Sequence, residues 1–210
     1  MDVCNLRREL LSLSQVYAQK MAQKNLEFSI DFDESFPEIA KLDINRLRQI
    51  ISHFLDNAIK FTTQGKVRLH AWAKLNNDCK AAVKISVEDS GCGISEEQIK
   101  EIFDPFVKSE EHPQFQGCGI GLCVCEQLTR ILGGKLSVVS ELGRGSCFTL
   151  ELPSVDLLDS SDETPSPLSA EGNWQYEFQP AELLVVDDVS FNRNLLEKVL
   201  KNQPFKIHFA

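Results

Sequence analysis

Two stretches of the chain place apolar residues at the three- and four-residue spacing of an amphipathic helix. In the first, within residues 1–24, these positions are Leu6, Leu10, Leu13, Tyr17 and Met21. The second follows Asp43, a plausible N-cap, and its broad apolar face consists of Leu47, Ile50, Ile51, Phe54, Leu55, Ala58 and Ile59. The pattern predicts two helices, and the first needs a partner surface to cover its apolar side.

Alternating or β-branched runs predict the strands. They cover residues 26–32, 67–75, 82–87, 135–139 and 146–152. Residues 96–102 predict a short helix, and residues 119–132 predict a longer one that ends at Gly133 and Gly134. Residues 103–117 have no convincing period.

The composition changes after Pro153. Residues 154–180 are acidic and rich in Ser and Pro, so they cannot bury enough apolar surface to order themselves, and they predict a linker. Beyond the linker, residues 183–186 predict a strand, residues 191–200 a helix and residues 206–209 a second strand. The C-terminal part is therefore expected to be a β-α-β unit.

Bulk composition restricts the class of protein. Hydrophobic residues at 42% and charged residues at 25% are typical of a globular chain, and a net charge of −9 argues against a nucleic-acid partner. The seven cysteines include no CxxC pair, which argues against a zinc site. No run approaches the roughly 18 apolar residues that span a bilayer, so we expect no membrane segment here and a cytoplasmic location, with any anchor elsewhere in a longer parent protein.

A polar stripe borders the apolar face of the helix that follows Asp43. His53 and Asn57 are four residues apart and share a face, and Lys60 lies about one turn further on. An asparagine offers a neutral oxygen to Mg²⁺, and a lysine offers positive charge to phosphate. The alternative is a solvated helix edge, which is what polar stripes usually are.

Two glycine-rich segments are candidates for ligand contact. In Asp89-Ser-Gly-Cys-Gly-Ile the glycines allow close backbone approach, and the carboxylate can accept a hydrogen bond from an exocyclic amine such as that of adenine. Gly117-Cys-Gly-Ile-Gly-Leu opens a helix, whose unpaired N–H groups suit phosphate. Taken singly, the first is also typical of a plain turn, and the second is weak evidence that does not fit a nicotinamide-binding unit.

The order of five short motifs is more informative than any one of them. They are LDNAIKFT (55–62), EDSGCGI (88–94), FDPF (103–106), GCGIGL (117–122) and GRGSCF (143–148). This series resembles the nucleotide-binding boxes of sensor histidine kinases, which belong to the GHKL superfamily, closely over residues 46–153. The resemblance implies an α/β (α+β) fold, a two-layer sandwich of a mixed β-sheet packed on helices, with ATP and Mg²⁺ as cofactors under a mobile lid.

The resemblance also implies a role for each matching position. Asn57 would ligate Mg²⁺, Lys60 would contact phosphate, and Asp89 would read the adenine amine, with Gly91 and Gly93 shaping the pocket. The remaining positions of the nucleotide site, including both ends of the lid, would be Phe103, Phe106, Gly117, Gly119, Gly121, Leu122 and Ser146.

His53 occupies the position where gyrase, Hsp90 and MutL ATPases carry a glutamate base, and a histidine there favours a kinase. We therefore expect His53 to act with Asn57 in the catalytic pocket and not as the phosphoacceptor. The lid, residues 107–116, is short and acidic and lacks the Ser-x-Thr-Arg stretch of many kinases; Lys108 is a candidate substitute for its phosphate contacts.

A shorter resemblance covers residues 183–193, which look like the first strand and acidic pair of a response-regulator receiver. Asp187 and Asp188 would be part of a Mg²⁺ site that is incomplete here. An ordinary strand that ends in a polar turn is the alternative.

The two resemblances together predict the domain organisation. Its parts are the end of a dimerisation helix or connector (1–25), the ATP-binding domain (26–153), the linker (154–180) and a truncated receiver (181–210).

The expected function is transfer of the ATP γ-phosphate to a histidine on a dimerisation domain that is absent from this chain. The expected partners are that domain and a receiver domain or response regulator, with no nucleic acid. Two alternatives remain: a GHKL-type ATPase, and a non-catalytic interaction module that binds nucleotide.

Overall fold

The computed structural model describes residues 2–77, 79–106, 119–158, 180–185 and 204–209. The chain divides into two compact units, Met1–Ser166 and Pro167–Ala210, and each is described by itself. The predictions for Lys108, Gly117, Asp187, Asp188 and the helix at 191–200 concern residues outside these described ranges.

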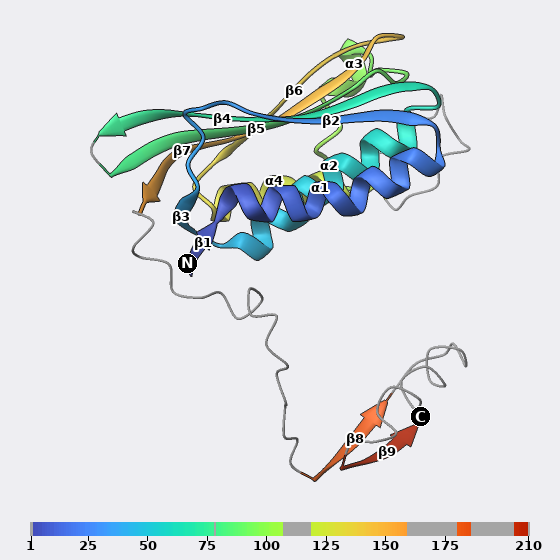
Figure 1. Cartoon of the computed structure of the whole chain (residues 1–210). Helices are drawn as coiled ribbons and strands as arrows, with labels where there is room; N and C mark the ends of the chain where they lie inside the picture. Colours follow the sequence, from blue (N-terminus) through green and yellow to red (C-terminus); the bar gives the residue numbers. More distant parts are fainter. Residues whose placement is uncertain (1, 78, 107–118, 159–179, 186–203, 210) are drawn as a thin grey trace. The chain divides into compact units, whose positions relative to one another are not determined.

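The first unit contains a mixed, seven-stranded sheet and helices (Figure 1). Its strands are β1 (Asp2–Asn5), β2 (Leu26–Phe32), β3 (Ile39–Leu42), β4 (Gly65–Asn77), β5 (Lys80–Asp89), β6 (Lys135–Glu141) and β7 (Gly145–Leu157). Its helices are α1 (Leu6–Gln23), α2 (Ile44–Phe61), α3 (Glu96–Ile99) and α4 (Gly121–Ile131). The strand order is β1-β3-β7-β5-β4-β2, with β6 paired to β7, and only the β2–β4 pair is parallel among these strands.

Helices α1, α2 and α4 cover one face of the sheet (Figure 1). The core lies between the two layers and includes Phe54 and Leu55 of α2 together with Leu69, Ile85 and Leu150 of the sheet. This arrangement confirms the predicted two-layer sandwich of a mixed sheet on helices.

Helix α1 finds its partner surface within this unit. The side chains of Leu6, Leu10, Tyr17 and Met21 are buried against the same core, and the Tyr17 hydroxyl donates to the carbonyl of Ser52 on α2 over 3.1 Å. Residues that the sequence suggested as a connector are therefore integral to the sandwich.

Both long helices begin where a polar side chain caps them. Asp43 Oδ1 accepts from the backbone N–H of Arg46 at 3.2 Å, which confirms the predicted N-cap of α2. Asn5 does the same for α1 by accepting from Arg8 N–H at 2.9 Å. Each cap satisfies a donor that the first turn of a helix otherwise leaves without a partner.

Strand β7 extends four residues beyond Pro153, where the sequence suggested that the domain ends. The pairing partners on β5 change from Val83↔Leu152 to Ala81↔Val155, so Pro153 lies in a bulge with one extra residue on β7. A bulge tolerates proline because no ladder N–H is required there. Val155 returns to the core, with 3% of its surface exposed.

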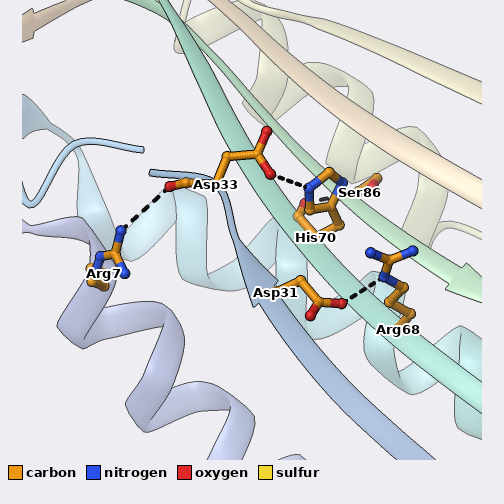
Figure 2. Close-up of polar contacts among 6 residues, drawn as sticks. All are labelled: Arg7, Asp31, Asp33, Arg68, His70 and Ser86. Carbon is orange, nitrogen blue, oxygen red and sulfur yellow. Dashed lines mark hydrogen bonds and ion pairs between the residues drawn. The ribbon is translucent and has the colours of Figure 1, made fainter. Parts of the chain in front are cut away.

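Side-chain pairs support the parallel pairing of β2 with β4 at the sheet edge (Figure 2). Arg68 contacts Asp31 at 2.6 Å, and the imidazole of His70 lies 2.9 Å from a carboxylate oxygen of Asp33. Arg7 reaches the Asp33 carbonyl from α1. Because the Arg68–Asp31 pair is about half exposed, we expect it to contribute little stability.

The second unit contains β8 (Ala181–Val185) and β9 (Phe205–Phe209), which pair in parallel. Parallel neighbours need a crossover connection, which agrees with the β-α-β order expected from the sequence. In the part of the chain that the structure describes, no helix is both long and apolar enough to cross a membrane.

Candidate functional site

Helix α2 carries the predicted polar stripe. His53, Asn57 and Lys60 are all partly buried. Burial lowers the pKa of His53 below its ordinary value, and the charge of Lys60 acts in the same direction while Asp56 opposes both. Burial also lowers the pKa of Lys60, whose ammonium lies 4.8 Å from the centre of the Phe61 ring. The stripe thus presents a neutral imidazole, an amide and one amine.

Asp89 ends β5 as a buried carboxyl with 8% of its surface exposed. Burial raises its pKa, and hydrogen bonds from the backbone N–H groups of Gly91 and Ser146 oppose that rise. The bond from Gly91 to Asp89 Oδ1 measures 2.8 Å. The site therefore holds a fixed, largely desolvated acceptor.

The loop after Asp89 packs tightly between α2 and the β6–β7 hairpin. A Cβ atom at Gly91 would lie 2.5 Å from the Phe61 carbonyl oxygen, and one at Gly93, where φ is +72°, would lie 2.1 Å from the carbonyl oxygen of Glu141. The Gly143 N–H donates to the Cys92 carbonyl at 2.6 Å. The first, second and fifth motifs are therefore in contact.

Helix α4 begins directly on His53. A Cβ atom at Gly121 would lie 1.9 Å from Cε1 of the imidazole, so a larger residue there would displace the ring or the helix. The Phe106 N–H donates to the Gly119 carbonyl at 2.9 Å, which joins the two ends of segment 107–118. The third and fourth motifs thereby meet at the site. Phe103 is partly buried, whereas Phe106 is 74% exposed.

The remaining predicted residues differ in their surroundings. Leu122 is partly buried and packs against the core. Ser146 is 7% exposed and lies directly opposite Asp89 in the β5–β7 ladder. The sequence did not single out Ser140, whose hydroxyl accepts from the Ile94 N–H in the loop after Asp89 and donates to the Gly145 carbonyl in the β6–β7 hairpin. Its position three residues before the GRGSCF motif is the sequence feature that could have indicated it.

A pocket of about 550 Å³ opens between α2 and α4. It is lined by Asn45, Arg48, Gln49, Ser52, His53, Asp56, Ile120, Gly121, Val124 and Cys125. Of the predicted site residues that the structure describes, His53 and Gly121 line this pocket, whereas Asn57 and Asp89 do not.

We predict that Gly145→Ala destabilises the first unit by about 2–3 kcal/mol, through positive-φ strain plus a steric clash. Gly145 has φ +108°, and an added Cβ would lie 1.9 Å from the Asp89 carbonyl oxygen. The matched control is Gly143→Ala, which has φ +81° but open space around its Cβ, and should cost only about 1 kcal/mol. Urea unfolding followed by circular dichroism measures both; equal costs would contradict the steric argument.

These features define the chain as an α/β sandwich in which the five ordered motifs meet beside α2. Residues 42–156 match the family described as histidine kinase-, DNA gyrase B-, and HSP90-like ATPase. The chain belongs to this family, and it contains a catalytic ATPase domain of the sensor histidine kinase type.

Curated relatives include sensor kinases from several organisms. The chain is 34% identical to the aerobic respiration control sensor protein ArcB of Escherichia coli over 94% of its own length and 25% of that protein. It is 31% identical to the sensor protein EvgS of E. coli, over 85% of the chain and 15% of EvgS. The hybrid signal transduction histidine kinase B of Dictyostelium discoideum is 33% identical over 66% of the chain and 7% of that protein. The chain thus spans at most a quarter of these relatives.

Solved structures share the fold. The catalytic domain of the histidine kinase ThkA has a TM-score of 0.58 and 26% identity, and the match covers 72% of this chain and 94% of that domain. Full-length ShkA, determined in complex with AMPPNP, has a TM-score of 0.62 and 24% identity over the whole of this chain and 41% of ShkA.

Proposed function

We propose that this chain binds Mg·ATP and transfers the γ-phosphate to a histidine on the dimerisation domain of a hybrid sensor kinase. The observation that carries the proposal is the contact of five separate motifs around α2. Gly91, in the loop expected to contact adenine, packs against the C-terminal end of α2. Gly121, at the start of the helix expected to face phosphate, packs against His53 of α2. Both segments therefore lie against α2.

The residues present suit a nucleotide with one magnesium ion. Among the described residues no group of three or more His, Cys, Asp or Glu side chains could hold a metal by itself. Magnesium would therefore depend on the amide oxygen of Asn57, on phosphate oxygens and on water, which is how this ion commonly binds beside nucleotides. The bound ion would offset charge on the phosphates.

The other predicted site residues would contact the base and the phosphates. Asp89 accepts from the adenine amine, Lys60 attracts phosphate oxygens, and the N-terminus of α4 at Gly121 directs backbone N–H groups towards them. The imidazole of His53 packs against Gly121 and would position the start of α4 one helical turn from Asn57. Phosphoryl transfer would then rest on alignment and charge stabilisation, with no covalent step on this domain.

The second unit is proposed to be the first part of a receiver domain. The parallel β8–β9 pair supports this proposal, as does the similarity to ArcB, which extends over 94% of the chain. Asp187 and Asp188 would contribute to the Mg²⁺ site of that domain. The partners would be the phosphoacceptor domain of the parent kinase and a receiver or response regulator.

Calorimetric titration of the chain with ATP tests the binding step. We expect micromolar affinity with Mg²⁺ and clearly weaker binding with EDTA, because Asn57 and the phosphates would share the ion. Asn57→Ala should lose the Mg²⁺ dependence, whereas Asn45→Ala, at the other end of α2, should keep it. No binding to the folded wild-type chain would overturn the proposal.

The fate of the phosphoryl group separates the alternatives. Labelled ATP is mixed with the chain and a separately supplied histidine-bearing dimerisation domain of a relative. Label on that histidine supports the kinase. Steady hydrolysis by the chain alone favours a GHKL-type ATPase, although the histidine at position 53 argues against it, and binding without transfer or hydrolysis favours an interaction module.

A further inference from the structure

Three polar side chains form a row across the inner face of the sheet at the end that carries the site. Ser146 of β7 is the direct partner of Asp89 on β5 and of Ser140 on β6. Directly opposed residues of antiparallel strands point to the same side of a sheet. The row therefore faces the helices, as does the buried carboxyl of Asp89, and Ser146 lies in its middle with 7% of its surface exposed.

The hydroxyl of Ser140 has three hydrogen-bond partners within 2.9 Å. It accepts from the backbone N–H of Ile94 at 2.8 Å and donates to the Gly145 carbonyl at 2.8 Å. Its third contact is the Ser146 hydroxyl oxygen at 2.9 Å. A hydroxyl has one proton and two lone pairs. The Gly145 carbonyl can only accept, so the arrangement that satisfies all three contacts takes the proton between the two serines from Ser146.

This direction determines what Ser146 can offer to a ligand. Its proton points to Ser140, and its backbone N–H stabilises the Asp89 carboxylate. The Ser146 hydroxyl therefore has only lone pairs left to present, beside a carboxylate that is itself an acceptor.

We propose that Ser140 is a specificity-determining positioning residue, which orients the Ser146 hydroxyl so that the base subsite presents only acceptors. Such a subsite suits the two N–H donors of the adenine amine and repels the carbonyl oxygen that guanine and hypoxanthine carry at the same ring position. A buried acceptor that faces another acceptor loses its partner and is costly. The inference rests on the proposed function, because it concerns how that same site reads its base.

The test compares ATP with inosine triphosphate, whose base carries a carbonyl in place of the amine and a proton on the adjacent ring nitrogen. The dissociation constants of both are measured by calorimetry for the wild-type chain and for Ser140→Ala. In the variant the Ser146 hydroxyl is free to turn and donate to the carbonyl. We expect the dissociation constant for inosine triphosphate, divided by that for ATP, to fall by about fivefold or more relative to the wild type.

The ratio separates this role from a merely structural one. Ser140→Ala also leaves the Ile94 N–H without its partner, which would weaken both nucleotides equally and leave the ratio unchanged. An unchanged ratio would overturn the proposal. Ser140→Thr keeps the hydroxyl and should restore the wild-type ratio, and Ser137→Ala, the same substitution on β6 at a position that points to the other face, should not alter it.

The outcome is also distinguishable from failure of the proposed function. If the folded wild-type chain bound neither nucleotide, the ATP site itself would be wrong. If it bound ATP and inosine triphosphate equally, the site would stand and the assignment of Ser140 would be wrong.

Discussion

Asp89→Asn is expected to reduce ATP affinity by about a hundredfold or more, because an amide N–H₂ group would face the adenine amine where a charged acceptor stood. The substitution preserves the shape of the side chain. It also retains one oxygen to accept from the Gly91 N–H, which in the wild type donates to Asp89 Oδ1 at 2.8 Å. Calorimetry gives the affinity. Glu88→Gln is the matched control, because it removes the same charge from an adjacent, exposed residue on the other face of the sheet. This variant should bind ATP as the wild type does.

The same variant has a predicted effect on pH dependence. Burial raises the pKa of Asp89 in the folded chain above its value in the unfolded chain. The folded state therefore holds this proton more tightly, and the stability that the bound proton contributes is fully present below the unfolded pKa. That stability is lost as the pH rises through the folded pKa. The stability of Asp89→Asn relative to the wild type should therefore increase with pH across that window. Urea unfolding at several pH values measures it, and a relative stability that decreased with pH would contradict the assigned direction.

Phe54→Ala should lower the free energy of unfolding of the first unit by about 3–5 kcal/mol. The Phe54 ring has none of its surface exposed and lies 5.5 Å, centroid to centroid, from the Phe148 ring of β7, so its removal leaves a cavity between α2 and the sheet. Phe106→Ala makes the same change at a side chain that is 74% exposed, and it should cost less than about 1 kcal/mol.

Both changes are measured by urea unfolding followed by circular dichroism. If the two phenylalanine variants lost similar stability, the helix–sheet interface would not be the main source of the unit's stability.

Much of the fold could be predicted because its elements are long enough to show a period. Helix α2 repeats its apolar spacing over several turns, and β4 and β5 alternate along most of their length. Strands β1 and β3 have four residues each, too few for an alternation to stand out, and they were not predicted. The bulge at Pro153 was missed because proline alone reads as a strand end.

The candidate site was predictable as a set of motifs but not as a set of contacts. Asp89 and Asn57 could be singled out from local sequence and from the resemblance of the ordered motifs. The partner of Ser140 lies 46 residues away at Ile94, and no periodicity indicates which strands become neighbours or in which register. The packing of Gly121 on His53 likewise depends on how α4 crosses α2, which only the folded chain reveals.

The hydrogen bond from the Phe106 N–H to the Gly119 carbonyl has a consequence for how this domain can diverge. It holds the two described residues that flank segment 107–118 beside each other, so both ends of the segment are anchored on the sandwich. For chains in general, the entropy of joining two anchored ends grows only with the logarithm of the length between them, by about 0.6 kcal/mol for each doubling. A change in the number of residues between Phe106 and Gly119 should therefore leave these anchors, and the packing of Gly121 on His53, in place.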